Sequence, residues 1–101
     1  MSAVIQNFKE WLQSSKSIFE DSGVSYEVSE TPDDADDEVA IWVDFDSSKY
    51  LSRITLWDTG LCVLEVLDNA SEDNVMLEQI ELVPSDRLDD CFKEFVGILT
   101  E

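Results

Sequence analysis

Residues 39–68 read VAIWVDFDSSKYLSRITLWDTGLCVLEVLD, and this stretch decides the fold. Apolar and polar residues alternate on both sides of a polar turn at 47–49, a pattern typical of strands with one buried face. A second turn ends on Gly60, and glycine tolerates the positive φ that a tight hairpin requires. The stretch therefore predicts three consecutive antiparallel strands, at residues 39–46, 50–57 and 61–68.

The third of these strands is apolar at nearly every position, which is typical of a central strand with a partner or cover on each side. Shorter alternating runs predict two more strands, at 24–28 and 75–83. Pro84 and Ser85 then open a last helix, with Ser85 as its expected N-cap.

The segment before the strands has the spacing of an amphipathic helix from Ser2 to about Asp21. Gly23 ends this helix, because glycine supplies the left-handed conformation that closes a helix C-terminus. The apolar stripe of the helix consists of Val4, Ile5, Phe8, Trp11, Leu12, Ile18 and Phe19, with Ser15 in the gap.

The order helix, five strands, helix defines the expected fold class. Strands joined by short turns form an antiparallel meander, and two terminal helices with one apolar stripe each have only that sheet to cover. We therefore expect an α+β fold, in which a five-stranded antiparallel meander carries the N- and C-terminal helices on one face. The other face of the sheet stays open unless a partner covers it.

Composition limits the chemistry. The chain has 101 residues, enough for one domain with a modest core, and it contains no histidine. Ser-His-Asp and Cys-His catalysis and histidine zinc sites are therefore excluded, and no nucleotide-binding motif is present. We expect a binding protein that is not an enzyme and uses no cofactor or metal.

Charge limits the partners. The chain has 24 Asp and Glu against 6 Lys and Arg, a net charge of −18. Such a charge repels nucleic acid and anionic membranes and attracts a basic protein, although high charge also serves solubility alone. No signal peptide or membrane-spanning run is apparent, and Cys62 and Cys91 suit small buried side chains better than a disulfide. We therefore expect a cytoplasmic protein.

Two surfaces are candidates for partner binding. Alternation places two tryptophans, several acids and one arginine on the uncovered face of the sheet, and Trp and Arg are rich in binding hot spots. This face carries Trp42, Asp44, Asp46, Arg53, Thr55, Trp57, Val63, Glu65 and Leu67. The alternative is that another segment covers the face, so that the tryptophans belong to the core.

The second candidate is the acidic segment, residues 30–38, which reads ETPDDADDE. Its carboxylates could dock on a basic cleft of the partner through Asp33, Asp34, Asp36, Asp37 and Glu38. The alternatives are a solvated connector and weak calcium binding. An EF-hand loop starting at Asp44 is excluded, because Lys49 stands where the loop needs glycine and Thr55 where it needs glutamate.

The hairpin sequence RITLWDTGLCVLEVLD at 53–68, together with FKEWL at 8–12, resembles the TriTu family of small acidic immunity proteins. This resemblance implies that residues 1–101 form one immunity-protein-like domain. It also implies a cytoplasmic inhibitor that binds a cognate Rhs-type polymorphic toxin, delivered by type VI secretion, in a 1:1 complex. The toxin domain implied is an ADP-ribosyltransferase that acts on elongation factor Tu, and no catalytic residues are implied for the inhibitor.

Two alternatives remain open at this point. A secretion chaperone for an effector protein is also small and acidic, but such chaperones typically form homodimers and hold a partly unfolded client. A nucleic-acid mimic would present carboxylates in place of phosphates and would compete with DNA for a basic partner.

Overall fold

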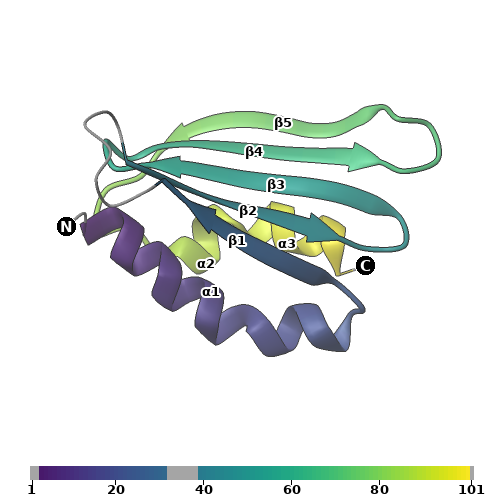
Figure 1. Cartoon of the computed structure of the whole chain (residues 1–101), viewed down its shortest axis with the longest axis horizontal. Coiled ribbons are helices and arrows are strands. Elements are labelled where there is room, and N and C mark those ends of the chain that lie inside the picture. Colours follow the sequence, from purple (N-terminus) through teal and green to yellow (C-terminus); the bar gives the residue numbers. More distant parts are fainter. Residues whose placement is uncertain (1–2, 32–38, 101) are drawn as a thin grey trace.

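The computed structural model describes residues 3–31 and 39–100. The chain folds as one long helix, a five-stranded sheet and two short helices (Figure 1). The elements in chain order are α1 (Ala3–Asp21), β1 (Ser25–Glu30), β2 (Ala40–Asp46), β3 (Tyr50–Trp57), β4 (Leu61–Asp68), β5 (Asn74–Glu81), α2 (Leu88–Cys91) and α3 (Lys93–Leu99).

The five strands form one antiparallel sheet in the order β1-β2-β3-β4-β5, so each strand pairs with its neighbours in sequence. The helices pack on one face of this sheet: Phe19 of α1 and Phe95 of α3 both contact Phe45 of β2, with ring centroids 5.0 and 5.4 Å apart. The expected α+β meander is therefore confirmed. We call the face turned away from the helices the open face.

The core lies between the sheet and the helices. Strict alternation within β2, β3 and β4 sends every second side chain inward, as the sequence predicts. The strand residues expected in the core are all at most 1% exposed: Val43, Phe45, Ile54, Leu56, Cys62, Leu64 and Val66. Aromatic rings of the helices close the core. The ring centroids of Trp11 in α1 and Phe92 are 4.7 Å apart.

The helix α1 follows its predicted stripe with one exception. The stripe residues are buried, and Gly23 has a φ of 77°, as expected for a glycine that closes a helix. Ile18, however, is 49% exposed. The prediction that Ile18 joins the apolar stripe is therefore wrong, because the last turn of α1 turns this position away from the sheet.

The β3–β4 hairpin turns on Gly60, whose φ is 96°. A Cβ atom at this position would collide with the backbone oxygen of Leu82, which follows β5. The Leu82 N–H donates a hydrogen bond to the Gly60 oxygen, with 2.8 Å between the nitrogen and oxygen atoms. Gly60 therefore sets both the turn and the position of the β5 end.

The edges of the sheet depart from the predicted burial. Val28 of β1 is 43% exposed because β1 is an edge strand that the helices cover only in part, so the prediction of a buried face there fails at this residue. In β4, the apolar residues Leu61, Val63 and Leu67 on the open face are half-buried. β4 nevertheless has a partner strand on each side, β3 and β5, as predicted for a central strand.

The C-terminal helix begins later than predicted. Ser85 is not its N-cap, since α2 starts at Leu88 and Arg87 occupies the cap position without a side-chain hydrogen bond. Asp86 instead accepts the Val83 N–H with its Oδ2 at 2.8 Å, which closes a turn ahead of the helix. The helix is also interrupted at Phe92, which has a φ of −104° and a ψ of 9° between α2 and α3.

Candidate functional site

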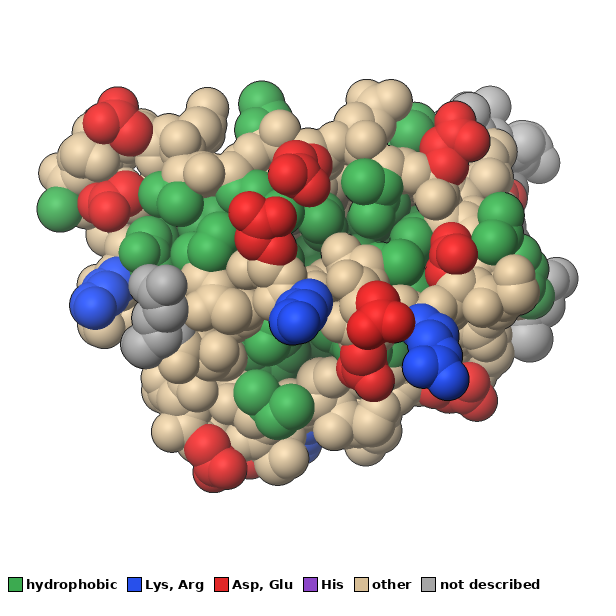
Figure 2. Space-filling model, turned by 180° about the vertical axis from the view of Figure 1, so that it is seen from behind, with side chains coloured by type: hydrophobic (Ala, Val, Ile, Leu, Met, Phe, Trp, Pro, Cys, Tyr) green, Lys and Arg blue, Asp and Glu red, His purple; other side chains and the backbone are tan. Residues whose placement is uncertain are grey.

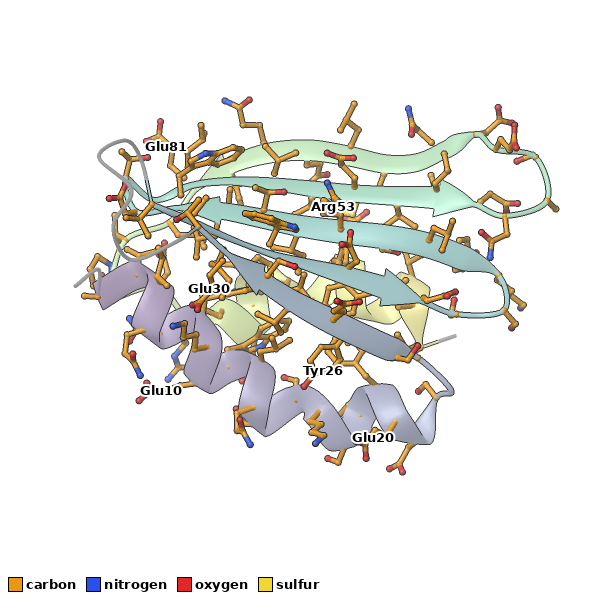
Figure 3. All side chains as sticks on the ribbon, viewed as in Figure 1. Glu10, Glu20, Tyr26, Glu30, Arg53 and Glu81 are labelled. Atoms are coloured by element: carbon orange, nitrogen blue, oxygen red, sulfur yellow. The ribbon has the colours of Figure 1, made fainter. Side chains whose placement is uncertain are left out.

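The open face carries a row of five side chains that crosses the whole sheet. Arg53 of β3 lies between Asp44 of β2 and Glu65 of β4, which are its Cα partners on either side. The row continues to Glu27 on β1 and Leu77 on β5. Figure 3 shows Arg53 at the middle of the sheet, on the side turned to the viewer. We call these five residues the central row.

An ion pair lies at the middle of the central row. The Arg53 Nε donates to the Asp44 Oδ1 at 2.6 Å, and the two side chains are 49% and 48% exposed. The hydrogen bond to Asp44 raises the pKa of Arg53, so the guanidinium stays charged. Because exposed pairs contribute little net stability, the pair mainly orders the face. Glu27 and Glu65 remain as exposed carboxylates on either side of it.

Both predicted tryptophans lie on the open face beside the central row. Trp42 is opposite Thr55 and Trp57 is opposite Ala40, so the two rings are diagonal neighbours on β2 and β3. Each is half-buried. The remaining tryptophan, Trp11, is only 6% exposed and belongs to the core. Trp42 and Trp57 therefore form an apolar surface that no described segment covers.

A shallow hollow of about 470 Å³ adjoins the central row on β1, β2 and β3. Its lining includes three carboxylates, Glu27, Asp44 and Asp46, together with Leu51. Only Asp44 of these carboxylates has a basic side chain within ion-pair distance among the described residues. The hollow is therefore an acidic surface with an exposed apolar side chain at its rim.

Sequence reasoning missed two exposed leucines on this face. Leu51 and Leu77 are 47% and 64% exposed, and Leu51 is the direct cross-strand partner of Leu67. Alternation in the sequence could have placed Leu51 on this face, because Leu51 stands two residues before Arg53 on β3. The face of Leu77 depends on its pairing with Glu65 between β4 and β5, which the sequence of β5 does not fix by itself.

The acidic segment is the part of the prediction that the structure leaves open. Asp33, Asp34, Asp36, Asp37 and Glu38 lie outside the described residues. The described residues on either side are firmly held: the Thr31 N–H donates to the Ala40 oxygen at 3.0 Å, and the Asp58 N–H donates to the Val39 oxygen at 2.9 Å. Because Ala40 is the cross-strand partner of Trp57, the described residues that flank this segment lie at the same end of the sheet as Trp57.

The described residues offer little for catalysis or metal binding. Within 3–31 and 39–100, no group of three or more Cys, Asp or Glu side chains could hold a metal ion. Cys62 and Cys91 are both free thiols. Burial raises the pKa of Cys62 to about 12 and also raises the pKa of Cys91, so neither is activated as a thiolate nucleophile. None of the helices in the described ranges is long and apolar enough to cross a membrane.

Comparison with known proteins gives the family. No curated protein matches the chain significantly. The family model described as "Immunity protein TriTu" matches residues 6–98, which run from α1 through the sheet to α3. The matched region includes the central row, both open-face tryptophans and the hairpin that resembled this family from the sequence alone. The chain therefore belongs to the TriTu family of immunity proteins.

Proposed function

We propose that this chain neutralises a cognate toxin domain by covering a basic cleft on the toxin with its open face. One observation carries the proposal: in an immunity protein, two half-buried tryptophans lie beside a row of carboxylates on a face that no described segment covers. Such a combination of aromatic anchors with a polar rim is typical of protein interfaces.

The charges and the aromatic rings have different roles in this proposal. The net charge of −18 steers the inhibitor toward a basic surface and raises the association rate. The hollow beside Asp44 receives a basic side chain of the toxin, and Trp42 and Trp57 lose water on contact and slow dissociation. The carboxylates of the acidic segment add to the negative charge that steers the inhibitor.

The finer identity of the toxin rests on the family resemblance. We infer an ADP-ribosyltransferase domain of an Rhs toxin of type VI secretion that acts on elongation factor Tu. A cleft that binds the phosphates of NAD needs arginine or lysine side chains, and an acidic face complements such a cleft. Occlusion of the cleft in a 1:1 complex in the cytoplasm suffices for protection, and it requires no catalysis by the immunity protein.

Co-expression with the toxin domain encoded immediately upstream tests the function. We expect growth to be rescued and a stable 1:1 complex to co-purify. Co-purification without rescue, with this chain as a homodimer that holds an unfolded client, would favour the secretion chaperone instead. Failure of both rescue and co-purification would contradict the proposal.

Single substitutions test the surface. We expect Trp42→Ala and Trp57→Ala each to weaken binding of the purified toxin domain by about tenfold or more, as is typical of hot-spot residues. Ile18→Ala is the matched control, since it removes an apolar side chain that is 49% exposed on α1, away from the open face. Wild-type affinity in both tryptophan variants, with unchanged thermal stability, would exclude the open face as the contact surface.

A further inference from the structure

The strand β5 has a free edge. It is the last strand in the sheet order and pairs with β4 alone among the described residues (Figure 1). The hydrogen bond from the Leu82 N–H to the Gly60 oxygen makes these two residues a hydrogen-bonded pair of the ladder. Since such pairs alternate along an antiparallel ladder, every second residue from Leu82 backward faces β4. The backbone groups of Leu77, Gln79 and Glu81 therefore point outward from the sheet.

This edge is protected against some partner strands and not against others. Proteins protect such edges with charged side chains, proline, short strands, bulges or covering segments. Glu78 and Glu81 of β5 oppose an acidic strand but not a basic one. β5 is eight residues long and contains no proline and no basic residue. The pairing of β5 with β4 has a register shift near the start of β5, opposite Val66 and Leu67. Residues Met76 to Glu81 pair regularly with β4.

The other edge of the sheet is different. β1 has six residues, and Figure 1 shows α1 running alongside it. Lys9 of α1 forms an ion pair with Glu30 at the end of β1. An incoming strand at β1 would therefore meet the helix, whereas β5 meets no other described element on its outer side.

The side chains around the β5 edge define the segment that fits it. Leu77 is 64% exposed on the open face, and Val75 and Val83 near the strand ends are 46% and 52% exposed. Residues 68–86 contain six acids and no base. Seen from the helix side, hydrophobic side chains gather at the level of β4 and β5, with acidic side chains among and around them (Figure 2). An added strand thus needs an apolar residue opposite Leu77 and basic residues opposite Glu78 and Glu81.

A second copy of this chain does not meet these requirements. Two copies each carry a net charge of −18 and repel one another, and β5 has no basic residue to pair with Glu78 or Glu81. We therefore propose that the β5 edge accepts an extended basic segment of the cognate toxin as a sixth strand of the sheet. This inference rests on the proposed function and adds a backbone contact at the β5 edge to the contact at the open face. Leu77 belongs to both contact surfaces.

Amide hydrogen exchange of this chain, alone and in complex with the toxin domain encoded upstream, tests the added strand directly. The amides of Leu77, Gln79 and Glu81 point to solvent in the free protein, and we expect their exchange to slow by about tenfold or more in the complex. The amides of Met76, Glu78 and Ile80 face β4 and serve as internal controls, because the ladder already protects them in the free protein.

A pair of variants gives an independent test. Gln79→Pro removes an outward N–H without removing a bond to β4, and proline is tolerated at such edge positions. We expect it to weaken toxin binding by about tenfold or more, while Gln79→Ala, which keeps the N–H, changes binding by less than about threefold. Thermal unfolding of both variants checks that the fold is retained.

The outcomes separate this inference from the proposed function. Suppose that a 1:1 complex forms and rescues growth, but that the amides of Leu77, Gln79 and Glu81 exchange as fast as in the free protein. This result would overturn the inference that the toxin adds a sixth strand, and it would leave the proposed immunity function unaffected. Equal toxin affinity of folded Gln79→Pro and Gln79→Ala variants also overturns it. If no complex forms, the proposed function fails, and the inference that rests on it fails with it.

Discussion

At the scale of single residues, Gly60 has the most specific backbone role. Its φ of 96° is strained for any other L-residue, and a Cβ atom there would meet the Leu82 oxygen. We expect Gly60→Ala to lower the free energy of unfolding by about 2 kcal/mol or more, because both the strain and the collision oppose it. Urea denaturation monitored by tryptophan fluorescence measures the change.

Gly97 supplies the matched control for this substitution. It lies within α3, and a Cβ atom there would meet nothing within 4 Å. We expect Gly97→Ala to raise the free energy of unfolding by about 0.5–1 kcal/mol, since alanine favours a helix interior. If the two variants changed stability in the same direction and by the same amount, the proposed role of Gly60 would be refuted.

Asp68, at the end of β4, gives a prediction on pH dependence. Hydrogen bonds from the backbone N–H groups of Ser71 and Ala70 lower the pKa of Asp68 below its ordinary value of 3.8. A lowered pKa in the folded state contributes stability above the unfolded pKa, and this contribution is lost as the pH falls through the folded pKa. We expect Asp68→Asn to be less stable than wild type at pH 7, with a difference that shrinks below about pH 4. A stability gap that stayed constant from pH 7 to pH 2.5 would contradict this assignment.

At the scale of elements, one side-chain hydrogen bond joins α1 to α2 beside aromatic packing. The indole N–H of Trp11 donates to the Asp89 Oδ1 at 3.0 Å. We expect Asp89→Ala to lower the free energy of unfolding by about 1.5 kcal/mol, because the largely buried indole N–H loses its charged acceptor. Chemical denaturation measures the loss, and Asp90→Ala removes a neighbouring exposed acid as the control. Equal effects of the two substitutions would show that the indole bond contributes nothing specific.

The elements that could be predicted from the sequence are those fixed by local periodicity. β3 and β4 begin and end at the predicted residues, because alternation and the turn at Gly60 act within the hairpin itself. The start of the C-terminal helix could not be predicted from Ser85, because the side chain of Asp86 competes for the preceding backbone. Phe92, where the helix is interrupted, contacts Phe8 and Trp11 of α1, and these contacts between residues distant in sequence could not be predicted from local periodicity.

The same distinction holds for the candidate site. Alternation alone predicts that Trp42, Arg53 and Trp57 share a face, since these residues lie on adjacent strands of one meander. The hollow beside Asp44 could not be predicted, because it depends on how β1 aligns with β2 and β3. The place of Leu77 on this face depends in the same way on its pairing with Glu65 of β4.

At the scale of the whole molecule, the distribution of charge sets the expected kinetics. Three of the six basic side chains, Lys9, Lys16 and Arg53, form ion pairs within the described residues, so many of the 24 acids have no basic partner there. Fields from exposed charges reach only about 8 Å at physiological salt and farther at low salt. Salt therefore separates long-range steering from short-range contact.

We expect the association rate constant with the toxin domain to fall by about tenfold or more between 20 mM and 150 mM salt, with little change in the dissociation rate. Reversal of charge at Asp33, Asp34, Asp36 and Asp37 to lysine should remove much of this salt dependence, if the acidic segment supplies the steering. The control reverses four exposed acids on the helices, Glu10, Asp21, Asp90 and Glu94, which leaves the net charge of the two variants equal. Stopped-flow association measures both variants. Equal association rates for the two would assign the steering to net charge, and a rate indifferent to salt in the wild type would exclude steering altogether.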